Sequence, residues 1–330
     1  MKRICVLFLL LVFCTACSYC IAENTYLPAY MSSIDSYNST MDPFRSGFSF
    51  RSGDWIYCPS GTGIEQSSII RFNFDDASMI ETVRVFDNEE FLPTFPFDNG
   101  QAILLTDTVS NRLIALEYDG KSHSELFQFE EAPGFEILVG DYLYYSQGTD
   151  VYELNYVTLE NRHIATYPGE KEIYGEYAVF AYGYIFVTVH GCGVYRINVA
   201  TGDLFDLSFV FKDYPGQIYV DKSAVLGYDH DLNYIATDYN GENKQFIEVG
   251  EYYIDEVVNK YILASNDSLL RYLFKYEGES FEQIDLSSMV PTELELPIGG
   301  VYLYEDRIFV EDYLKQIETS KPCIVAYPIE

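Results

Sequence analysis

The sequence predicts an all-β protein made of repeated four-stranded antiparallel sheets. Short extended segments recur along its 330 residues and are rich in Tyr (31) and Phe (23), which both favour strands. Turns that contain Gly, Asn and Asp separate these segments, and no long stretch has the three-and-four apolar spacing of a helix. The pattern repeats about every 40 residues, and four-stranded units of that period close into a β-propeller.

The clearest unit lies between Tyr182 and Phe209, where two tight turns join three strands. Ile185, Val187 and Val189 recur there at the alternate spacing of a strand. The same order of short strands and tight turns recurs through the rest of the chain. Equivalent apolar residues mark seven units: Ile56, Ile103, Leu143, Ile185, Val225, Ile262 and Ile308.

Turn residues support this division. Asp119-Gly120, Asn240-Gly241 and Glu277-Gly278 fall at one equivalent place, between the third and fourth strands of their units, and Thr201-Gly202 does so in the fourth unit. Glycine after Asp or Asn supplies the positive φ of a tight hairpin. We therefore predict two-residue hairpins at these places.

The repeats span residues 44–330 and predict seven blades, with six or eight as alternatives because the first and last units are stretched. The last unit lacks a fourth strand, since the chain stops after Ile329. Residues 23–43 form a linker or a lone strand near Tyr26–Tyr30, which we expect to supply the missing edge. Such a seal hides two sheet edges that would otherwise invite aggregation.

The first 22 residues have the layout of a secretory signal peptide. Lys2 and Arg3 precede an apolar run, Ile4–Phe13, and small residues follow. Two processing sites compete. Cys14-Thr15-Ala16-Cys17 resembles a bacterial lipobox, with Cys14 in place of the usual leucine, and would make Cys17 a lipid anchor. Cleavage after Ala22 would instead release the protein. The sequence thus predicts an exported protein, lipid-anchored in the cell envelope or secreted.

The chain is strongly acidic, with 51 Asp and Glu against 20 Lys and Arg and a formal charge of −31. A body of this charge repels phosphate backbones, so we expect no nucleic-acid partner. We expect membrane contact only through the lipid anchor. Protein, peptide and glycan partners remain.

Three cysteines lie in the body: Cys58, Cys192 and Cys323. Their spacing matches no metal site or disulfide framework. In a closed ring Cys58 and Cys323 fall in adjacent units, so a disulfide between them is one interpretation. The other is three small buried apolar side chains.

The chain carries no catalytic signature. Its four histidines, His123, His163, His190 and His230, fall in different units. Asp229, Asp231 and Asn233 offer alternating oxygen ligands as a calcium loop does, but the Gly and the closing Glu of such a loop are absent. A weak calcium site and a polar hairpin turn are the two interpretations.

Two stretches carry a resemblance to known propellers. Gly140–Ser146 (GDYLYYS) and Tyr118-Asp119-Gly120 resemble bacterial extracytoplasmic propellers related to the YWTD type of the low-density-lipoprotein receptor and to TolB-like propellers. Val194–Asp203 is similar to the pyrroloquinoline-quinone-type repeat, but Trp55 is the one Trp of the chain, so no quinone cofactor is implied. The resemblance implies a propeller that serves as an extracytoplasmic binding platform.

We therefore predict an exported binding or scaffold module that engages a peptide, glycan or partner protein through one face or the central channel. The alternative is a hydrolase or lyase that uses carboxylates in the channel, which requires acidic groups with opposed environments at one face.

Overall fold

The computed structural model confirms the all-β prediction for the residues that it describes. No helix occurs among them. They are residues 49–61, 66–87, 91, 96–168, 177–189, 192–211, 218–220, 224–231, 233–246, 253–258, 261–265, 271–277, 280–284, 301–304, 307–311 and 324–328.

Within these residues the strands form seven antiparallel sheets, six of four strands and one of three, each in chain order. The first sheet contains β1 (Phe50–Ser52), β2 (Trp55–Gly61), β3 (Gln66–Asn73) and β4 (Ile80–Asp87). The second contains β5 (Phe97–Asp98), β6 (Ile103–Asp107), β7 (Arg112–Leu116) and β8 (His123–Gln128). The third contains β9 (Glu136–Val139), β10 (Tyr142–Gln147), β11 (Asp150–Asn155) and β12 (Glu160–Thr166).

The fourth sheet contains β13 (Tyr177–Ala181), β14 (Tyr184–Val189), β15 (Gly193–Asn198) and β16 (Leu204–Asp206). The fifth contains β17 (Tyr219–Val220), β18 (Val225–Tyr228), β19 (Tyr234–Thr237) and β20 (Gln245–Phe246). The sixth contains β21 (Tyr253–Val258), β22 (Tyr261–Ser265), β23 (Arg271–Glu277) and β24 (Ser280–Ile284). The three-stranded sheet contains β25 (Val301–Tyr304), β26 (Arg307–Glu311) and β27 (Ile324–Pro328).

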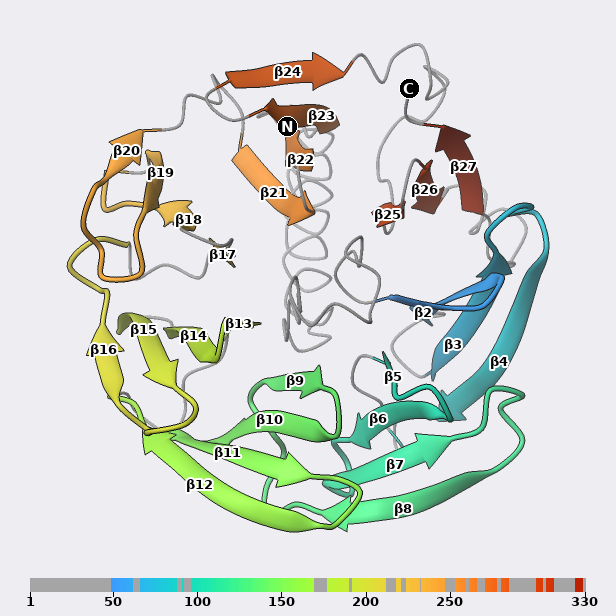
Figure 1. Cartoon of the computed structure of the whole chain (residues 1–330). Helices are drawn as coiled ribbons and strands as arrows, with labels where there is room; N and C mark the ends of the chain where they lie inside the picture. Colours follow the sequence, from blue (N-terminus) through green and yellow to red (C-terminus); the bar gives the residue numbers. More distant parts are fainter. Residues whose placement is uncertain are drawn as a thin grey trace, which may run out of the picture.

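The sheets lie around a circle, with the first strand of each toward the centre and the last at the periphery (Figure 1). The seven apolar residues that marked the repeats all fall on the second strand of a sheet: β2, β6, β10, β14, β18, β22 and β26. The repeat pattern was therefore assigned correctly at the level of elements.

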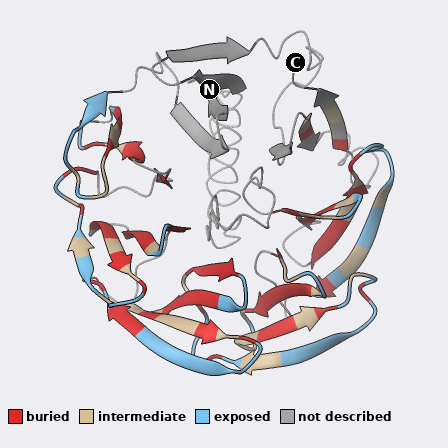
Figure 2. Ribbon diagram, in the orientation of Figure 1, coloured by how far each residue is buried: buried red, intermediate tan, exposed pale blue. Residues whose placement is uncertain are grey.

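The outer strands β4, β8 and β12 expose much of their surface, whereas the inner strands of the same sheets are buried (Figure 2). Charged side chains such as Glu81, Arg84, Glu125 and Glu160 occupy these outer strands. Charge on an edge strand disfavours pairing with another chain, so the pattern keeps the periphery from aggregating.

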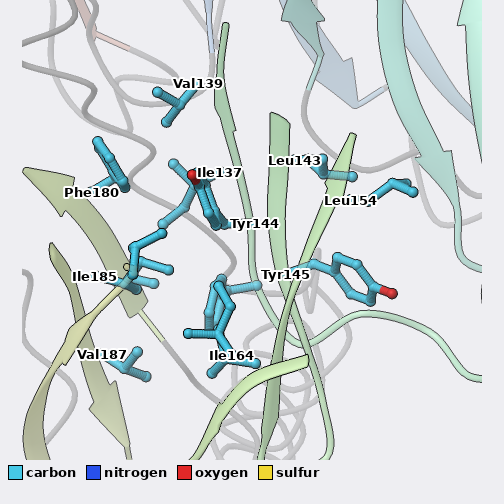
Figure 3. Close-up of a cluster of buried hydrophobic side chains, with 14 of the residues drawn as sticks. Ile137, Val139, Leu143, Tyr144, Tyr145, Leu154, Ile164, Phe180, Ile185 and Val187 are labelled. Atoms are coloured by element: carbon cyan, nitrogen blue, oxygen red, sulfur yellow. The ribbon is translucent and has the colours of Figure 1, made fainter. Parts of the chain in front are cut away.

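Apolar side chains from neighbouring sheets pack against each other. Between the third and fourth sheets, Tyr144 on β10 stacks on Phe180 on β13 with ring centroids 5.2 Å apart. Ile137, Leu143 and Ile185 belong to the same buried cluster (Figure 3). Complete burial of such side chains stabilises the fold by about 1.5–3 kcal/mol each, so the contact between sheets is a principal source of stability.

The hairpins between third and fourth strands differ from the prediction in part. At Asn240-Gly241 the loop has three residues, because Asp238 N–H donates to Glu242 O (3.0 Å), and at Asp119-Gly120 it has four, because Glu117 N–H donates to Ser122 O (2.9 Å). The prediction is confirmed between β23 and β24, where Glu277 pairs with Ser280 across a two-residue loop. The glycines do have positive φ, as expected: 70° at Gly120 and 75° at both Gly202 and Gly241. Two-residue turns also occur between first and second strands, as at Gly140-Asp141.

The three-stranded sheet contacts the first sheet. Phe309 on β26 is fully buried and its ring lies 5.0 Å from that of Phe72 and 5.7 Å from that of Phe74. Ile324 on β27 joins the same cluster. The predicted closing strand in residues 23–43 lies outside the described residues and stays a prediction.

Candidate functional site

Arginine side chains fasten the loop between the third and fourth strands of one sheet to the preceding sheet. Each donates a hydrogen bond to a backbone carbonyl in that loop. The donors and acceptors are Arg71 to Tyr118 O (3.5 Å), Arg84 to Gly120 O (3.0 Å), Arg162 to Val199 O (3.2 Å), Arg196 to Tyr239 O (2.5 Å) and Arg307 to Phe74 O (2.5 Å). We call these contacts the arginine clasps.

The loop glycines lie close to the preceding sheet as well. A Cβ atom at Gly120 would fall 1.9 Å from the carbonyl oxygen of Val83, and one at Gly202 would fall 2.4 Å from that of Ile164. Only glycine therefore satisfies both the positive φ and the close approach. Together with the clasps, this holds the loops rigidly against their neighbours.

One end of each sheet carries both the first–second and the third–fourth turns, because neighbouring strands are antiparallel. We call it the turn end. Several exposed apolar side chains lie at the turn end of the third and fourth sheets. They are Tyr142 (41% exposed), Val157 (65%), Leu159 (50%), Tyr182 (37%) and Leu204 (37%), and we call them the apolar rim.

Two residues of the apolar rim have a backbone conformation that L-residues avoid. Leu159 has a φ of 61° and Tyr182 a φ of 51°. Equivalent turns use glycine: Gly202 in place of Leu159, and Gly140 in place of Tyr182. The left-handed region costs an L-residue about 1–2 kcal/mol. Strain of this kind clusters at functional sites, so it singles out the rim.

Acidic side chains flank the apolar rim. Asp141, Glu160 and Asp203 are exposed and adjacent in sequence to Tyr142, Leu159 and Leu204. The nearby arginines are already engaged. Arg162 pairs with Glu153 at 3.0 Å, and the Arg196 guanidinium lies 5.0 Å from the Tyr184 ring centroid. The free charge beside the rim is therefore negative.

The calcium candidate is a hairpin turn between β18 and β19. Asp229 is buried, and one of its oxygens accepts the N–H groups of Asp231 and Asn233, both at 2.9 Å. Lys244 Nζ lies 2.6 Å from the other oxygen. These contacts fit the second of the two interpretations, a polar hairpin turn. No group of three or more His, Cys, Asp or Glu that would hold a metal occurs in the described part of the chain. Calcium binding stays a prediction.

Asp229→Asn is expected to lower the free energy of unfolding at pH 7 by about 2 kcal/mol, since hydrogen bonds to a charged group are lost. Burial by itself raises the pKa of Asp229, but the hydrogen bonds from Lys244, Asn233 and Asp231 outweigh it and lower the pKa. The stabilisation is therefore present above the unfolded pKa of about 3.9 and is lost as pH falls through the folded pKa.

Urea denaturation between pH 7 and pH 3.5 measures this effect. The difference between Asp229→Asn and wild type should shrink below about pH 4. The exposed neighbour gives the control: Asp231→Asn should change stability by less than about 0.5 kcal/mol. A difference that stays constant with pH would contradict the role assigned to the carboxylate.

His163, Asp150 and Thr166 form a polar cluster on the outer half of the third sheet. Nε2 of His163 lies 3.2 Å from both Asp150 Oδ1 and Thr166 Oγ1, and Thr166 donates its proton to Asp150. In a nucleophile–His–acid triad the two ring nitrogens serve the two partners separately. Here one nitrogen faces both, so the cluster does not form a triad. His190 lies outside the described residues.

The cysteine predictions stay untested. Cys58 is fully buried among Ile56, Phe72 and Ile324, and Cys192 is partly buried. Cys323 and the lipidation candidate Cys17 lie outside the described residues. None of the described segments is a helix long and apolar enough to cross a membrane.

The repeated four-stranded antiparallel sheets define the class: the chain is structurally similar to β-propellers. It matches the computationally designed Ika8 protein with a TM-score of 0.52 and 9% identity, over 80% of this chain and 81% of that one. It matches BamB from Moraxella catarrhalis with a TM-score of 0.49 and 10% identity, over 84% and 82%.

A nidogen/laminin complex matches with a TM-score of 0.44 and 15% identity, over 58% of this chain and 74% of that one. No protein-family model and no curated protein matches the sequence. At identities this low the likeness to Ika8 shows the fold alone.

Proposed function

We propose that the protein is an exported binding or scaffold module that engages a partner protein through the apolar rim. The observation that carries the proposal is that five apolar side chains are exposed at the same end of two adjacent sheets. Exposed apolar patches rimmed by polar residues mark sites of protein interaction. The arginine clasp from Arg162 to Val199 joins these two sheets and gives the site a rigid base.

The scaffold in this proposal is a closed ring of seven blades. The burial of Phe309 against Phe72 supports contact between the last sheet and the first, and the clasp from Arg307 to Phe74 has the geometry of the other clasps. A strand near Tyr26–Tyr30 would supply the fourth strand of the last blade. This closure would complete the last blade, so that all seven sheets have four strands.

Two further features belong to the proposal. Cys323 directly precedes Ile324, which packs in the same cluster as Cys58, and this supports a disulfide between the two cysteines. Residues 1–22 act as the export signal, and lipidation of Cys17 would hold the module at the envelope surface. A secreted form follows if cleavage occurs after Ala22.

Site-specific photo-crosslinking tests the proposed surface. Val157 on the apolar rim and Val109 at the opposite end of the second sheet are both exposed valines, so a photoreactive residue at either place should leave the fold intact. In the host, position 157 is expected to form a discrete crosslinked adduct with a partner, whereas position 109 forms none. Adducts at position 109 alone, or at neither position, would overturn the proposal.

A further inference from the structure

We propose that the ligand of the apolar rim is a basic, apolar peptide segment of a partner protein, whose Arg or Lys side chains contact the Tyr182 ring and the flanking carboxylates. The inference rests on the proposed function and deepens it, because it assigns the chemistry of the partner. Three features support it. Two apolar residues of the rim have a strained backbone, acidic side chains surround the rim, and the chain places its own arginine side chains over aromatic rings.

Leu159 and Tyr182 are the first feature. Among the described residues, positive φ at a residue other than Gly occurs at Asn111, Leu159, Tyr182 and Asn243. Asn adopts this conformation readily, whereas Leu and Tyr do not. Both bulky exceptions are exposed, and both lie on the apolar rim. Glycine at either position would relieve the strain. The Tyr182 ring lies 6.2 Å from the Tyr239 ring centroid, yet the Tyr182 side chain keeps 37% of its surface exposed and Leu159 keeps 50%, so both can contact a ligand from outside.

Charge is the second feature. Asp141, Glu160 and Asp203 border the rim, and the whole chain has a formal charge of −31. A second copy of this chain would bring the same negative surface and be repelled, and so would a nucleic acid. A segment that combines apolar and basic side chains complements both the rim and its border.

The third feature is that arginine side chains of this chain already lie over aromatic rings at the turn end. The Arg71 guanidinium lies 4.5 Å from the Trp55 ring centroid, and that of Arg196 lies 5.0 Å from the Tyr184 ring centroid. A cation over an aromatic face is attracted by the ring quadrupole. Tyr182 lies two residues before Tyr184 and contacts the Tyr239 ring, and its exposed part, 37% of the residue, is where an incoming guanidinium would bind.

Calorimetric titration of the full chain with two synthetic peptides of equal length tests the inference. One peptide contains only Arg and Leu, and the other only Glu and Leu. We expect the Arg–Leu peptide to bind at least about tenfold more tightly, with an affinity that falls as salt screens the carboxylates. Equal binding of the two peptides would overturn the inference.

Charge-neutral variants separate the rim from general attraction to an acidic protein. The double variant Leu159→Gly, Tyr182→Gly should bind the Arg–Leu peptide about tenfold more weakly, while its circular dichroism spectrum stays that of the folded wild type. Val109→Ser, at the opposite end, should bind as wild type does. Unchanged binding by the double variant would show non-specific attraction and overturn the inference.

The two proposals can fail separately. If position 157 forms its adduct in the host but the Arg–Leu peptide binds no more tightly than the Glu–Leu peptide, the rim binds a partner of other chemistry. In that case the proposed function stands and the inference about basic segments falls. If position 157 forms no adduct, the proposed function falls whatever the peptides do.

Discussion

Gly120→Ala is expected to lower the free energy of unfolding by about 3 kcal/mol, the sum of left-handed strain and a forced separation of two sheets. The added Cβ would lie 1.9 Å from the Val83 carbonyl oxygen, and neither backbone can retreat without breaking the clasp from Arg84 to Gly120 O. For a domain of this size the melting temperature should fall by about 5 °C.

Gly140→Ala is the matched control for this prediction. Gly140 also has a positive φ, 57°, but a Cβ there would meet no atom within 4 Å. It should therefore cost only the conformational strain, about 1 kcal/mol. Differential scanning calorimetry compares the two variants directly. If Gly120→Ala and Gly140→Ala lowered the free energy of unfolding equally, the third–fourth loops would not be packed against the preceding sheet.

Phe309→Ala should lower the free energy of unfolding by about 3–5 kcal/mol, because the ring is fully buried between the last sheet and the first. Loss of the ring leaves a cavity beside Phe72 and Phe74 at the place where the two ends of the repeat array meet. We expect faster proteolysis as well, since opening at this contact exposes strand edges.

Phe246→Ala, at an exposed phenylalanine on β20, is the control and should change stability by less than about 0.5 kcal/mol. A chain that lacks residues 23–43 adds a second comparison. If these residues seal the ring, their removal should destabilise the chain and make Phe309→Ala less costly than in the full chain. A small effect of Phe309→Ala in the full chain would refute a role for this contact in stability.

Much of the fold follows from local pattern. Alternating apolar residues at Ile185 and Val187 require a strand whichever sheet they join, and the repeat of that pattern at Leu143 and Val225 places the second strand of each unit. The lengths of the turns at Asp119-Gly120 and Asn240-Gly241 could not be predicted from the sequence, because Asp-Gly and Asn-Gly occur in loops of several lengths that share a glycine of positive φ.

The candidate site was harder to predict. Leu159 and Tyr182 look like ordinary apolar residues in the sequence, and their strain appears only when their turns are aligned with those that contain Gly202 and Gly140. The arginine clasps were also missed. One signal would have found part of them: Arg71 and Arg196 each stand two residues before an Asn that begins the loop, at Asn73 and Asn198.

The clasps have a consequence for how such a chain evolves. Their acceptors are main-chain carbonyls of Phe74, Tyr118, Gly120, Val199 and Tyr239. A main-chain carbonyl is present whichever amino acid occupies the position, so the residues other than Gly120 can be substituted while the hydrogen bond between the sheets is kept. Gly120 is fixed by its close approach to Val83. An architecture fastened in this way can be inherited long after sequence likeness has faded.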